Sequence, residues 1–351
     1  MNAVLRHAGV LDAATVTSVE LATPEEEGNA GGALRARLQY GDAGPGLPAS
    51  VIVKLPPETP EHRRAMLRTG FVRAEAGFYR ELAERVPLRT PHCYLALDDD
   101  DGNAVLVLED LGDVPGSWPA RRLNAEHARL MLARLAELHA RFWNVTGLER
   151  YPWLAPPSAR VSYWQSALSE ICGLLDAVVD GELPPQIPEL IATVVPRLPA
   201  IAAHLDGPPF TLVHGDFTFR NAALVDGEPI AFDWQLCQRM RGARDVAYLM
   251  PFLNLSEDPG VRPRSLVNGY HDRLLELGVT DYSREALAYD QDLAMLEVIQ
   301  IGLATPWPWL RSLRDSGERV PLERLGLVKM IAAGLERTGL LAKVRSDFSC
   351  E

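Results

Sequence analysis

The side chains best suited to chemistry lie in two short segments, HGDFTFRN at residues 214 to 221 and FDW at residues 232 to 234. Asp216 and Asn221 share one tight loop between short apolar runs, and Asp233 ends a predicted β-hairpin that should bring it beside them. Mg²⁺ takes oxygen ligands, usually few of them from the protein, and phosphate oxygens complete its octahedron. The two carboxylates and the carboxamide therefore suit a divalent cation together with a base.

The spacing within and between these segments is that of a kinase. Asp216 and Asn221 form a D-x-x-x-x-N pattern, and Asp233 follows 233 − 216 = 17 residues after the first aspartate. Kinases use this order for a catalytic loop and a metal-binding aspartate. Such a site also needs a lysine on an upstream strand and a glutamate on a helix to hold it.

Lys54, in the apolar run VIVKL, and Glu75, within a predicted helix, meet that requirement. Lysine is rare in this chain, with three residues against thirty-two arginines. A compact ammonium reaches nucleotide phosphates as a point charge, whereas a guanidinium has a different shape. The alternative is that Lys54 extends into solvent from a half-exposed edge strand, and Glu75 is one of several glutamates on its helix.

With these residues in view, the sequence resembles the aminoglycoside phosphotransferase/choline kinase family, which has a protein-kinase-like fold. HGDFTFRN is similar to the HGDxxxxN loop of that family, and FDW to its metal-binding segment. VIVKLP, EAGFYREL, LVLEDLG and RDVAYL look like the ecdysteroid-kinase-like (CHK-type) branch and its bacterial relatives. The resemblance covers roughly residues 15 to 340, which is nearly the whole chain.

The resemblance implies ATP-dependent phosphorylation of a hydroxyl group on a small molecule. Asp216 would accept or orient the proton of the acceptor hydroxyl. Asn221 and Asp233 would hold Mg²⁺, and Lys54, fixed by Glu75, would contact the phosphates of ATP. Positioning and charge neutralisation supply most of the rate of phosphoryl transfer, so these few groups account for the chemistry.

The resemblance further implies a hinge against adenine at residues 108 to 111, with Leu108, Glu109 and Leu111 as nucleotide-binding residues. His214 is expected to orient the loop rather than carry a proton. The glycine-bearing segment Glu25–Gly32 lies where a phosphate-covering loop belongs, but it departs from G-x-G-x-x-G and carries three glutamates.

Two alternative functions remain open from the sequence. One is a catalytically silent nucleotide-binding pseudokinase, although such proteins usually lose at least one of the groups present here. The other is a metallohydrolase built on His214, Asp216 and Asp233. That reaction would need further His or Asp ligands at metal-binding spacing, and the eight histidines show none.

Hydrophobic periodicity predicts an α+β, bilobed fold with an N-terminal lobe at residues 1–111 and a larger, mainly helical lobe at residues 112–351. The first lobe should hold an antiparallel sheet and one main helix, from about residue 61 to residue 85. Alternating or β-branched runs predict its strands at Thr15–Leu21, Gly32–Tyr40, Ser50–Leu55, His92–Leu97 and Ala104–Leu108. In the second lobe we expect a helix at Asn124–Trp143, a strand at Thr211–Val213, and a hairpin of Ala223–Val225 with Ile230–Phe232.

Composition limits the partners. The 351 residues carry 35 basic and 47 acidic side chains, a net charge of −12, which argues against binding to nucleic-acid backbones or anionic membranes. Four scattered cysteines without a CxxC motif predict reduced thiols and a cytoplasmic protein. We expect a small-molecule hydroxyl substrate as the partner. The identity of the acceptor and the oligomeric state are not encoded in any pattern we recognise.

Overall fold

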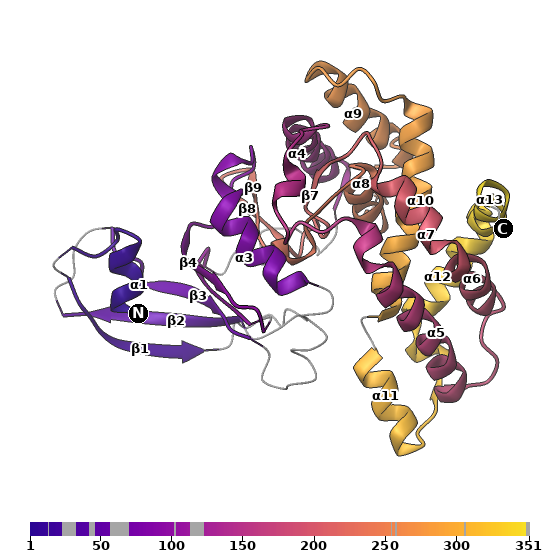
Figure 1. The fold of residues 1–351 in the computed structure, drawn as a ribbon, viewed down its shortest axis with the longest axis horizontal. Coiled ribbons are helices and arrows are strands. Elements are labelled where there is room, and N and C mark those ends of the chain that lie inside the picture. Colours follow the sequence, from indigo (N-terminus) through magenta and orange to yellow (C-terminus); the bar gives the residue numbers. More distant parts are fainter. Residues whose placement is uncertain are drawn as a thin grey trace. The chain divides into compact units, whose positions relative to one another are not determined.

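The computed structural model describes residues 1–351 except 13, 23–32, 42–45, 57–69, 102, 113–122, 254, 257, 305–306 and 349–351. The chain divides into two compact units (Figure 1). Unit 1 comprises residues 1–155, 212–238 and 249–279, and unit 2 comprises residues 156–211, 239–248 and 280–351. The predicted lobe boundary after Leu111 stays a prediction.

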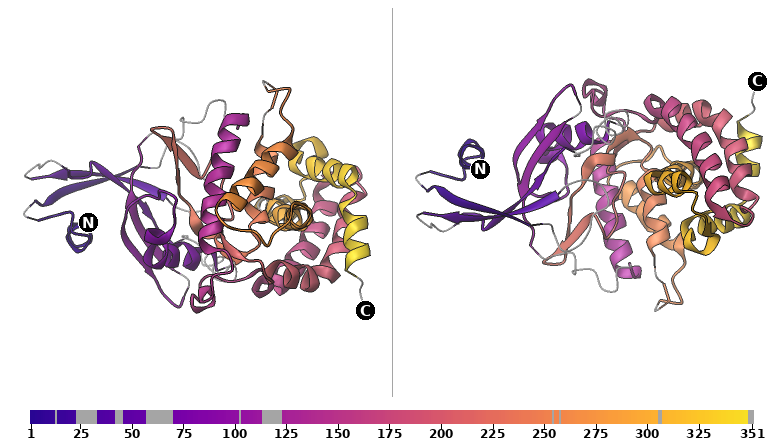
Figure 2. Two further views of the ribbon diagram at one scale, coloured as in Figure 1. Left: turned by 90° about the horizontal axis from the view of Figure 1, so that it is seen from above. Right: turned by 90° about the horizontal axis from the view of Figure 1, so that it is seen from below.

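Unit 1 begins with an antiparallel sheet of five strands in the order β1-β2-β3-β5-β4. Figure 2 shows β1 and β2 side by side at one edge of this sheet, as their pairing requires. Apolar side chains on one face of the sheet pack with Leu5 of the short helix α1 into a buried cluster. The elements are α1 (Asn2–His7), β1 (Val16–Ala22), β2 (Ala33–Tyr40), β3 (Ser50–Lys54), β4 (Cys93–Asp98) and β5 (Ala104–Glu109).

Strand β3 lies in the middle of the sheet, between β2 and β5. Val53 of β3 pairs with Leu34 on one side and with Val107 on the other. The β-branched residues of β3 suit this position, because they pack well on a pleated surface covered by neighbours. Lys54 is therefore not on an edge strand, and the edge-strand alternative is wrong.

Helix α3 (Phe71–Glu81) packs against strands β4 and β5. Its buried face includes Ala74, Glu75 and Phe78, so the Glu75 carboxyl group lies among apolar neighbours. The helix ends at Glu81 and a 3-10 turn follows at Ala83–Arg85, whereas the sequence predicted one continuous helix to residue 85. Leu82 has φ −124° and breaks the helical geometry there.

The remainder of unit 1 carries a long helix and a hairpin. Helix α4 (Ala125–Phe142) begins as predicted, because the Asn124 side chain accepts a hydrogen bond from the His127 N–H at 2.9 Å. Asp226 and Gly227, at φ +53° and +80°, form the tight turn of the β8–β9 hairpin. The other elements of unit 1 are β7 (Thr211–Val213), except Thr211, and β8 (Ala222–Val225), β9 (Glu228–Ala231) and α9 (Pro263–Glu276). Strand β10 (Gln238–Met240) belongs to unit 2 from residue 239 on, and α8 (Ala243–Leu249) belongs to unit 2 except for Leu249.

Unit 2 is almost entirely helical (Figure 2). Its longest helix, α10, packs against α5, α7 and α12. The helices are α5 (Val161–Val178), α6 (Gln186–Val194), α7 (Leu198–Asp206), α10 (Arg284–Ala304), α11 (Trp307–Ser316), α12 (Gly326–Thr338) and α13 (Leu340–Asp347), with short strands β6 (Val179–Asp180) and β11 (Val320–Pro321). Single 3-10 turns lie at Leu148–Arg150 and Met250–Phe252 in unit 1, and at Pro157–Arg160, Val195–Arg197 and Leu322–Arg324 in unit 2. No helix among the described residues is both long enough and apolar enough to cross a bilayer.

A buried carboxylate on α10 ties several segments of unit 2 together. Asp290 is 1% exposed, and it accepts hydrogen bonds from His204 Nε2 at 2.7 Å, Arg241 Nη1 at 3.0 Å and the Tyr282 hydroxyl at 2.7 Å. Three donors satisfy a charge that would otherwise be costly to bury. Asp290 is therefore expected to stabilise the helical unit rather than to act in catalysis.

The substitution Asp290→Ala should lower the free energy of unfolding by about 3–5 kcal/mol, because it leaves a buried guanidinium without its partner. Asp292→Ala, on the same helix, is the matched control: Asp292 is exposed and pairs with Lys343 at 2.6 Å. Losing that surface pair should cost less than about 1 kcal/mol. Urea unfolding of both variants measures the difference, and equal losses would show that Asp290 does not hold the unit together.

Candidate active site

Three of the predicted site residues converge on one point in unit 1. Lys54, at the end of β3, places its Nζ 2.7 Å from Glu75 Oε1 and 2.9 Å from Asp233 Oδ1. Glu75 comes from α3, and Asp233 follows the β8–β9 hairpin 179 residues after Lys54. One ammonium group thus joins the sheet, the helix and the hairpin, as the kinase interpretation of the sequence requires.

The electrostatics keep this lysine charged. Burial by itself lowers the pKa of Lys54, but the carboxylates of Asp233 and Glu75 outweigh burial and raise the pKa well above its ordinary value. Burial raises the pKa of Glu75, and the neighbouring Lys54 opposes that rise. The cluster therefore presents a permanent positive charge beside two carboxyl groups.

Asp233 is held in an unusual backbone conformation by its neighbour Trp234. Asp233 has φ +64° and ψ +61°, a left-handed geometry that few residues other than glycine adopt without cost. The indole of Trp234 is fully buried and stacks on Phe78 of α3, with ring centroids 3.8 Å apart and planes 8° from parallel. The Trp234 backbone N–H also donates to the Glu75 carboxylate. Helix α3 thus fixes both the lysine's partner and the direction of Asp233.

The loop that carries Asp216 is organised by His214. His214 is fully buried, its Nδ1 accepts from the Asp216 N–H at 3.1 Å, and its Nε2 lies 3.1 Å from the main-chain oxygen of Phe232. These partners assign a neutral imidazole that donates from Nε2. Both ring nitrogens contact the main chain, which agrees with the expected orienting role. His214 links the Asp216 loop to the residue before Asp233.

Gly215 allows this loop to lie against the segment after Asp233. It has φ +85°, and a Cβ built on it would lie 2.2 Å from the main-chain oxygen of Leu236. A side chain at this position would have to displace backbone, not a flexible side chain. Only glycine therefore fits between His214 and Asp216.

Gly215→Ala should cost about 3 kcal/mol or more of folding stability, because strain from positive φ adds to a steric clash with backbone. Gly227→Ala separates the two effects: Gly227 also has positive φ, at +80°, but has nothing within 4 Å of a built Cβ. That control should cost only about 1–2 kcal/mol. Chemical denaturation provides the comparison, and an equal loss in both variants would mean that the close approach at Leu236 is unimportant.

Asn221 and Asp233, the predicted metal ligands, lie at the open end of the β8–β9 hairpin. The Phe232 N–H donates to the main-chain oxygen of Asn221 at 2.9 Å, at the open end of the hairpin. Asp233 follows Phe232 directly, so it lies one residue beyond the position paired with Asn221. Asn221 Nδ2 donates to the main-chain oxygen of Asp216 at 3.1 Å, so Oδ1 is the side-chain atom that could bind a metal ion. A carboxamide oxygen and a carboxylate fit Mg²⁺, which completes its shell with phosphate and water.

A metal site formed by protein side chains alone has no support in these residues. Within the described part of the chain, no three or more His, Cys, Asp or Glu side chains are grouped so that they could hold a metal ion. The metallohydrolase alternative required such a group around His214, Asp216 and Asp233.

The predicted hinge lies at the end of β5. Leu108 is buried and pairs with Ile52 and Cys93, while the Glu109 N–H donates to the main-chain oxygen of His92 at 2.7 Å. That N–H is thus engaged within unit 1, and a nucleotide would have to use other groups of Glu109 and Leu111. The predicted phosphate-covering loop, Glu25–Gly32, lies outside the described residues.

Sequence reasoning missed the residue that fixes this hinge. The Asp110 side chain is 3% exposed and binds Arg35 Nε of β2 at 2.7 Å, the Ser50 hydroxyl of β3 at 2.5 Å and the Gly112 N–H at 2.9 Å. The only signal was a second acidic residue beside Glu109, and nothing in the sequence connects it to Arg35. Asp110 fastens the predicted hinge segment to two strands, one of which carries Lys54.

Known proteins resemble this chain in sequence family and in fold. Solved structures with the same fold include an aminoglycoside-3'-phosphotransferase of type VIII, at 22% identity over 80% of this chain and 93% of that one, with a TM-score of 0.50. Choline kinase from Cryptosporidium parvum matches at 10% identity over 92% and 91% of the two chains, with a TM-score of 0.53. The GDP and kanamycin complex of APH(2")-IIIa matches at 13% over 94% and 97%, with a TM-score of 0.54.

A search of curated proteins gives no match. The model of the phosphotransferase enzyme family matches residues 26–286, about three quarters of the chain, and this span includes every residue of the candidate site. The protein-kinase-like fold of the neighbours agrees with the α+β architecture predicted from the sequence. The chain belongs to the phosphotransferase enzyme family.

Proposed function

We propose that this protein transfers the γ-phosphate of ATP, with Mg²⁺, to a hydroxyl group of a small molecule. The observation that carries the proposal is the meeting of Lys54, Glu75 and Asp233, from three elements far apart in sequence, beside the loop that holds Asp216 and Asn221. Family membership supports a phosphotransferase acting on small molecules.

Each side chain has one task in this reaction. Lys54 contacts the phosphates of ATP as a fixed positive charge, and Glu75 keeps its ammonium group in place. Asn221 Oδ1 and the Asp233 carboxylate hold the metal ion, which neutralises charge on the phosphates when bound. Asp216 accepts the hydrogen bond of the acceptor hydroxyl and takes up its proton as the phosphate transfers. His214 holds the Asp216 main chain in position.

In this proposal the nucleotide binds between the predicted hinge and Lys54. Main-chain groups of residues 108 to 111 contact the base, and Asp110 keeps that segment fixed to β2 and β3. ATP is the proposed donor. The structure with GDP among the neighbours makes GTP the nucleotide to compare with it. The ecdysteroid-kinase-like branch stays a prediction from the motifs quoted above.

Calorimetry with ATP or GTP, each with and without Mg²⁺, tests the nucleotide site. ADP release in the presence of a panel of sugars, amino alcohols and simple alcohols then tests transfer. We expect Mg²⁺-dependent binding followed by acceptor-dependent ADP release. Absence of nucleotide binding would refute the proposal, and tight binding with no transfer to any hydroxyl would favour the pseudokinase alternative.

Replacing Lys54 by methionine should lower kcat/KM for ATP by about 100-fold or more, the size of effect seen when a charge-stabilising donor is lost. Because the pKa of Lys54 is raised, the lysine stays protonated up to and beyond its ordinary value of 10.5. Deprotonation of Lys54 should therefore not reduce kcat/KM at any pH below that value. Lys329→Met is the control, since Lys329 is half exposed and lies 3.7 Å from Glu323. If kcat/KM fell as little in Lys54→Met as in the control, Lys54 would not contact the phosphates of ATP.

A further inference from the structure

A buried tryptophan contacts helix α3 on the side that faces away from Lys54. In this helix Gly77 lies about 200° around the axis from Glu75, because successive residues turn by about 100°. A Cβ built on Gly77 would lie 2.4 Å from both Cγ and Cδ2 of Trp153. The indole of Trp153 therefore rests on the backbone of α3, opposite the carboxylate that binds Lys54.

Glycine at position 77 serves this close contact. Gly77 lies within the helix and has no positive φ, so the backbone conformation does not require a glycine. Glycine is also unfavourable inside a helix, because it loses more backbone freedom on folding than any other residue. What it allows here is the approach of Trp153, which is only 8% exposed.

Hydrogen bonds attach the same segment to α3 and to the turn after it. Trp153 Nε1 donates to Glu81 Oε1 at 2.9 Å, and Glu81 lies one turn after Gly77. This bond also satisfies the indole N–H, which a buried tryptophan needs. Two residues before Trp153, the Tyr151 hydroxyl accepts a hydrogen bond from Arg85 Nη1 at 2.6 Å. Residues 151–153 therefore hold the C-terminal half of the helix.

Other outward contacts of α3 are weaker. Arg73 pairs with Asp98 at 3.4 Å and with Asp100 at 3.0 Å, and its side chain is 39% exposed. Ion pairs exposed to solvent contribute little to stability. On the outward side of α3, the buried indole is therefore a firmer contact than these pairs.

We propose that Trp153 is a positioning residue for the phosphate-binding lysine: it holds α3 where Glu75 binds the Lys54 ammonium group at 2.7 Å. An N–H···O hydrogen bond spans about 2.7–3.2 Å, so a shift of α3 by about 1 Å would separate the two groups. The consequence for catalysis rests on the proposed function, whereas the effect on α3 and on the Lys54–Glu75 pair does not.

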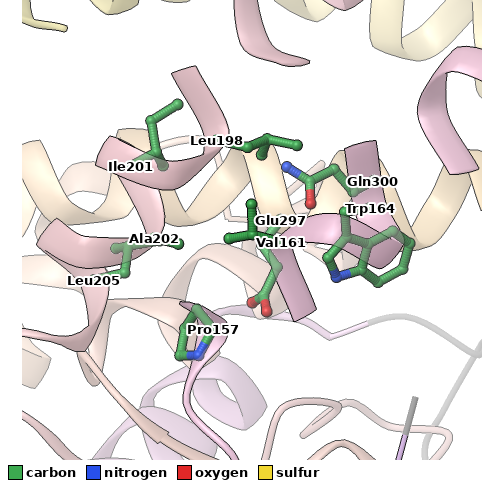
Figure 3. Close-up of a pocket in the computed structure, with 9 residues that line it drawn as sticks. All are labelled: Pro157, Val161, Trp164, Leu198, Ile201, Ala202, Leu205, Glu297 and Gln300. Atoms are coloured by element: carbon green, nitrogen blue, oxygen red, sulfur yellow. The ribbon is translucent and has the colours of Figure 1, made fainter. Parts of the chain in front are cut away.

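Hydrogen exchange without nucleotide tests the contact with α3. In Trp153→Ala the amides of α3 should exchange at least tenfold faster than in wild type, because the helix opens more readily without the indole. Trp164→Ala is the matched control. Trp164 is 6% exposed and lies among side chains of α5, α7 and α10 in unit 2 (Figure 3). Its loss should leave exchange in α3 as in wild type, and equal exchange of α3 in the two variants would overturn the proposal.

A double-mutant cycle tests the link to Lys54, with Trp153→Phe as a milder variant that keeps an aromatic ring. Lys54 and Trp153 contact opposite sides of α3, so independent effects on the urea midpoint would add. In the Trp153→Phe background, one of the two carboxylates that contact the ammonium group is already displaced. The midpoint shift caused by Lys54→Met should therefore be about half of its wild-type size. Additive shifts would show that Trp153 contributes to stability alone.

Kinetics with ATP and Mg²⁺ test the consequence for the reaction. Trp153→Phe should lower kcat/KM for ATP at least fivefold, and it should have no further effect in Lys54→Met. Gly77→Ala should reproduce the loss, because its methyl group takes the place of the indole. Gly173→Ala is the control, since Gly173 of α5 is exposed and has nothing within 4 Å of a built Cβ.

The outcomes separate this inference from the proposed function. Wild-type kcat/KM in Trp153→Phe, despite faster exchange in α3, would refute the positioning role. If the wild-type protein shows no turnover, the proposed function fails. Hydrogen exchange and the urea midpoints then still decide whether Trp153 holds α3 and the Lys54–Glu75 pair.

Discussion

Asp216→Asn should reduce turnover by about 10³-fold while leaving the affinity for nucleotide within about threefold of wild type, because general-base catalysis contributes roughly 10²–10⁴-fold and the carboxamide keeps the size of the side chain. The loop should stay folded, since its main chain is fixed by His214 and by the Asn221 side chain. The KM for the acceptor should change little, so the loss should fall on kcat.

Asp226→Asn is a matched control for this variant. Asp226 lies at the exposed tip of the β8–β9 hairpin, and no role in the reaction is predicted for it. Its substitution makes the same chemical change, from a carboxylate to a carboxamide. Its kcat should equal that of wild type. If Asp216→Asn retained a tenth or more of the wild-type kcat, Asp216 would not be the group that accepts the proton.

Asp233→Asn should abolish the dependence of ATP binding on Mg²⁺ and lower activity by at least about 10³-fold, since the metal contributes several kcal/mol of charge stabilisation. Asparagine is preferable to alanine here, because residue 233 has positive φ and asparagine tolerates that conformation. The variant also removes one of the two carboxylates that contact Lys54, but Glu75 still holds the ammonium group.

Calorimetric titration of ATP at several Mg²⁺ concentrations measures this effect. Asp226→Asn again serves as the control, because residue 226 also has positive φ, at +53°, and the substitution tests backbone tolerance alone. An unchanged Mg²⁺ dependence in Asp233→Asn, together with wild-type behaviour of the control, would show that Asp233 does not hold the metal.

The features predicted most accurately from sequence were those decided by neighbouring residues. The alternating segment forms strand β2 at Ala33–Tyr40, and Asn124 caps α4 as expected. The segments HGDFTFRN and FDW are separated by only a few residues that form a hairpin. Their sequence therefore predicted that Asp216, Asn221 and Asp233 lie near one another. Local geometry made those inferences possible.

Features decided by contacts between distant segments could not be predicted in the same way. The run VIVKL gives no indication whether its strand is central or at an edge, because strand order depends on residues 104–109 pairing with it. The same limit hid Asp110, whose partners Arg35 and Ser50 lie 75 and 60 residues away.

Because Asp110 binds Ser50, strand β3 sets the distance between the predicted hinge and Lys54. Ser50 begins the strand and Lys54 ends it, and four residues of extended chain span about 13 Å. In the proposed roles, the segment that binds the base is attached to Ser50 at the start of β3, and the phosphate-binding amine of Lys54 lies at the end of the strand. The distance between the base site and the phosphate site is then fixed by the length of the strand. A nucleotide that lacks its terminal phosphates would therefore contact the base site without reaching Lys54.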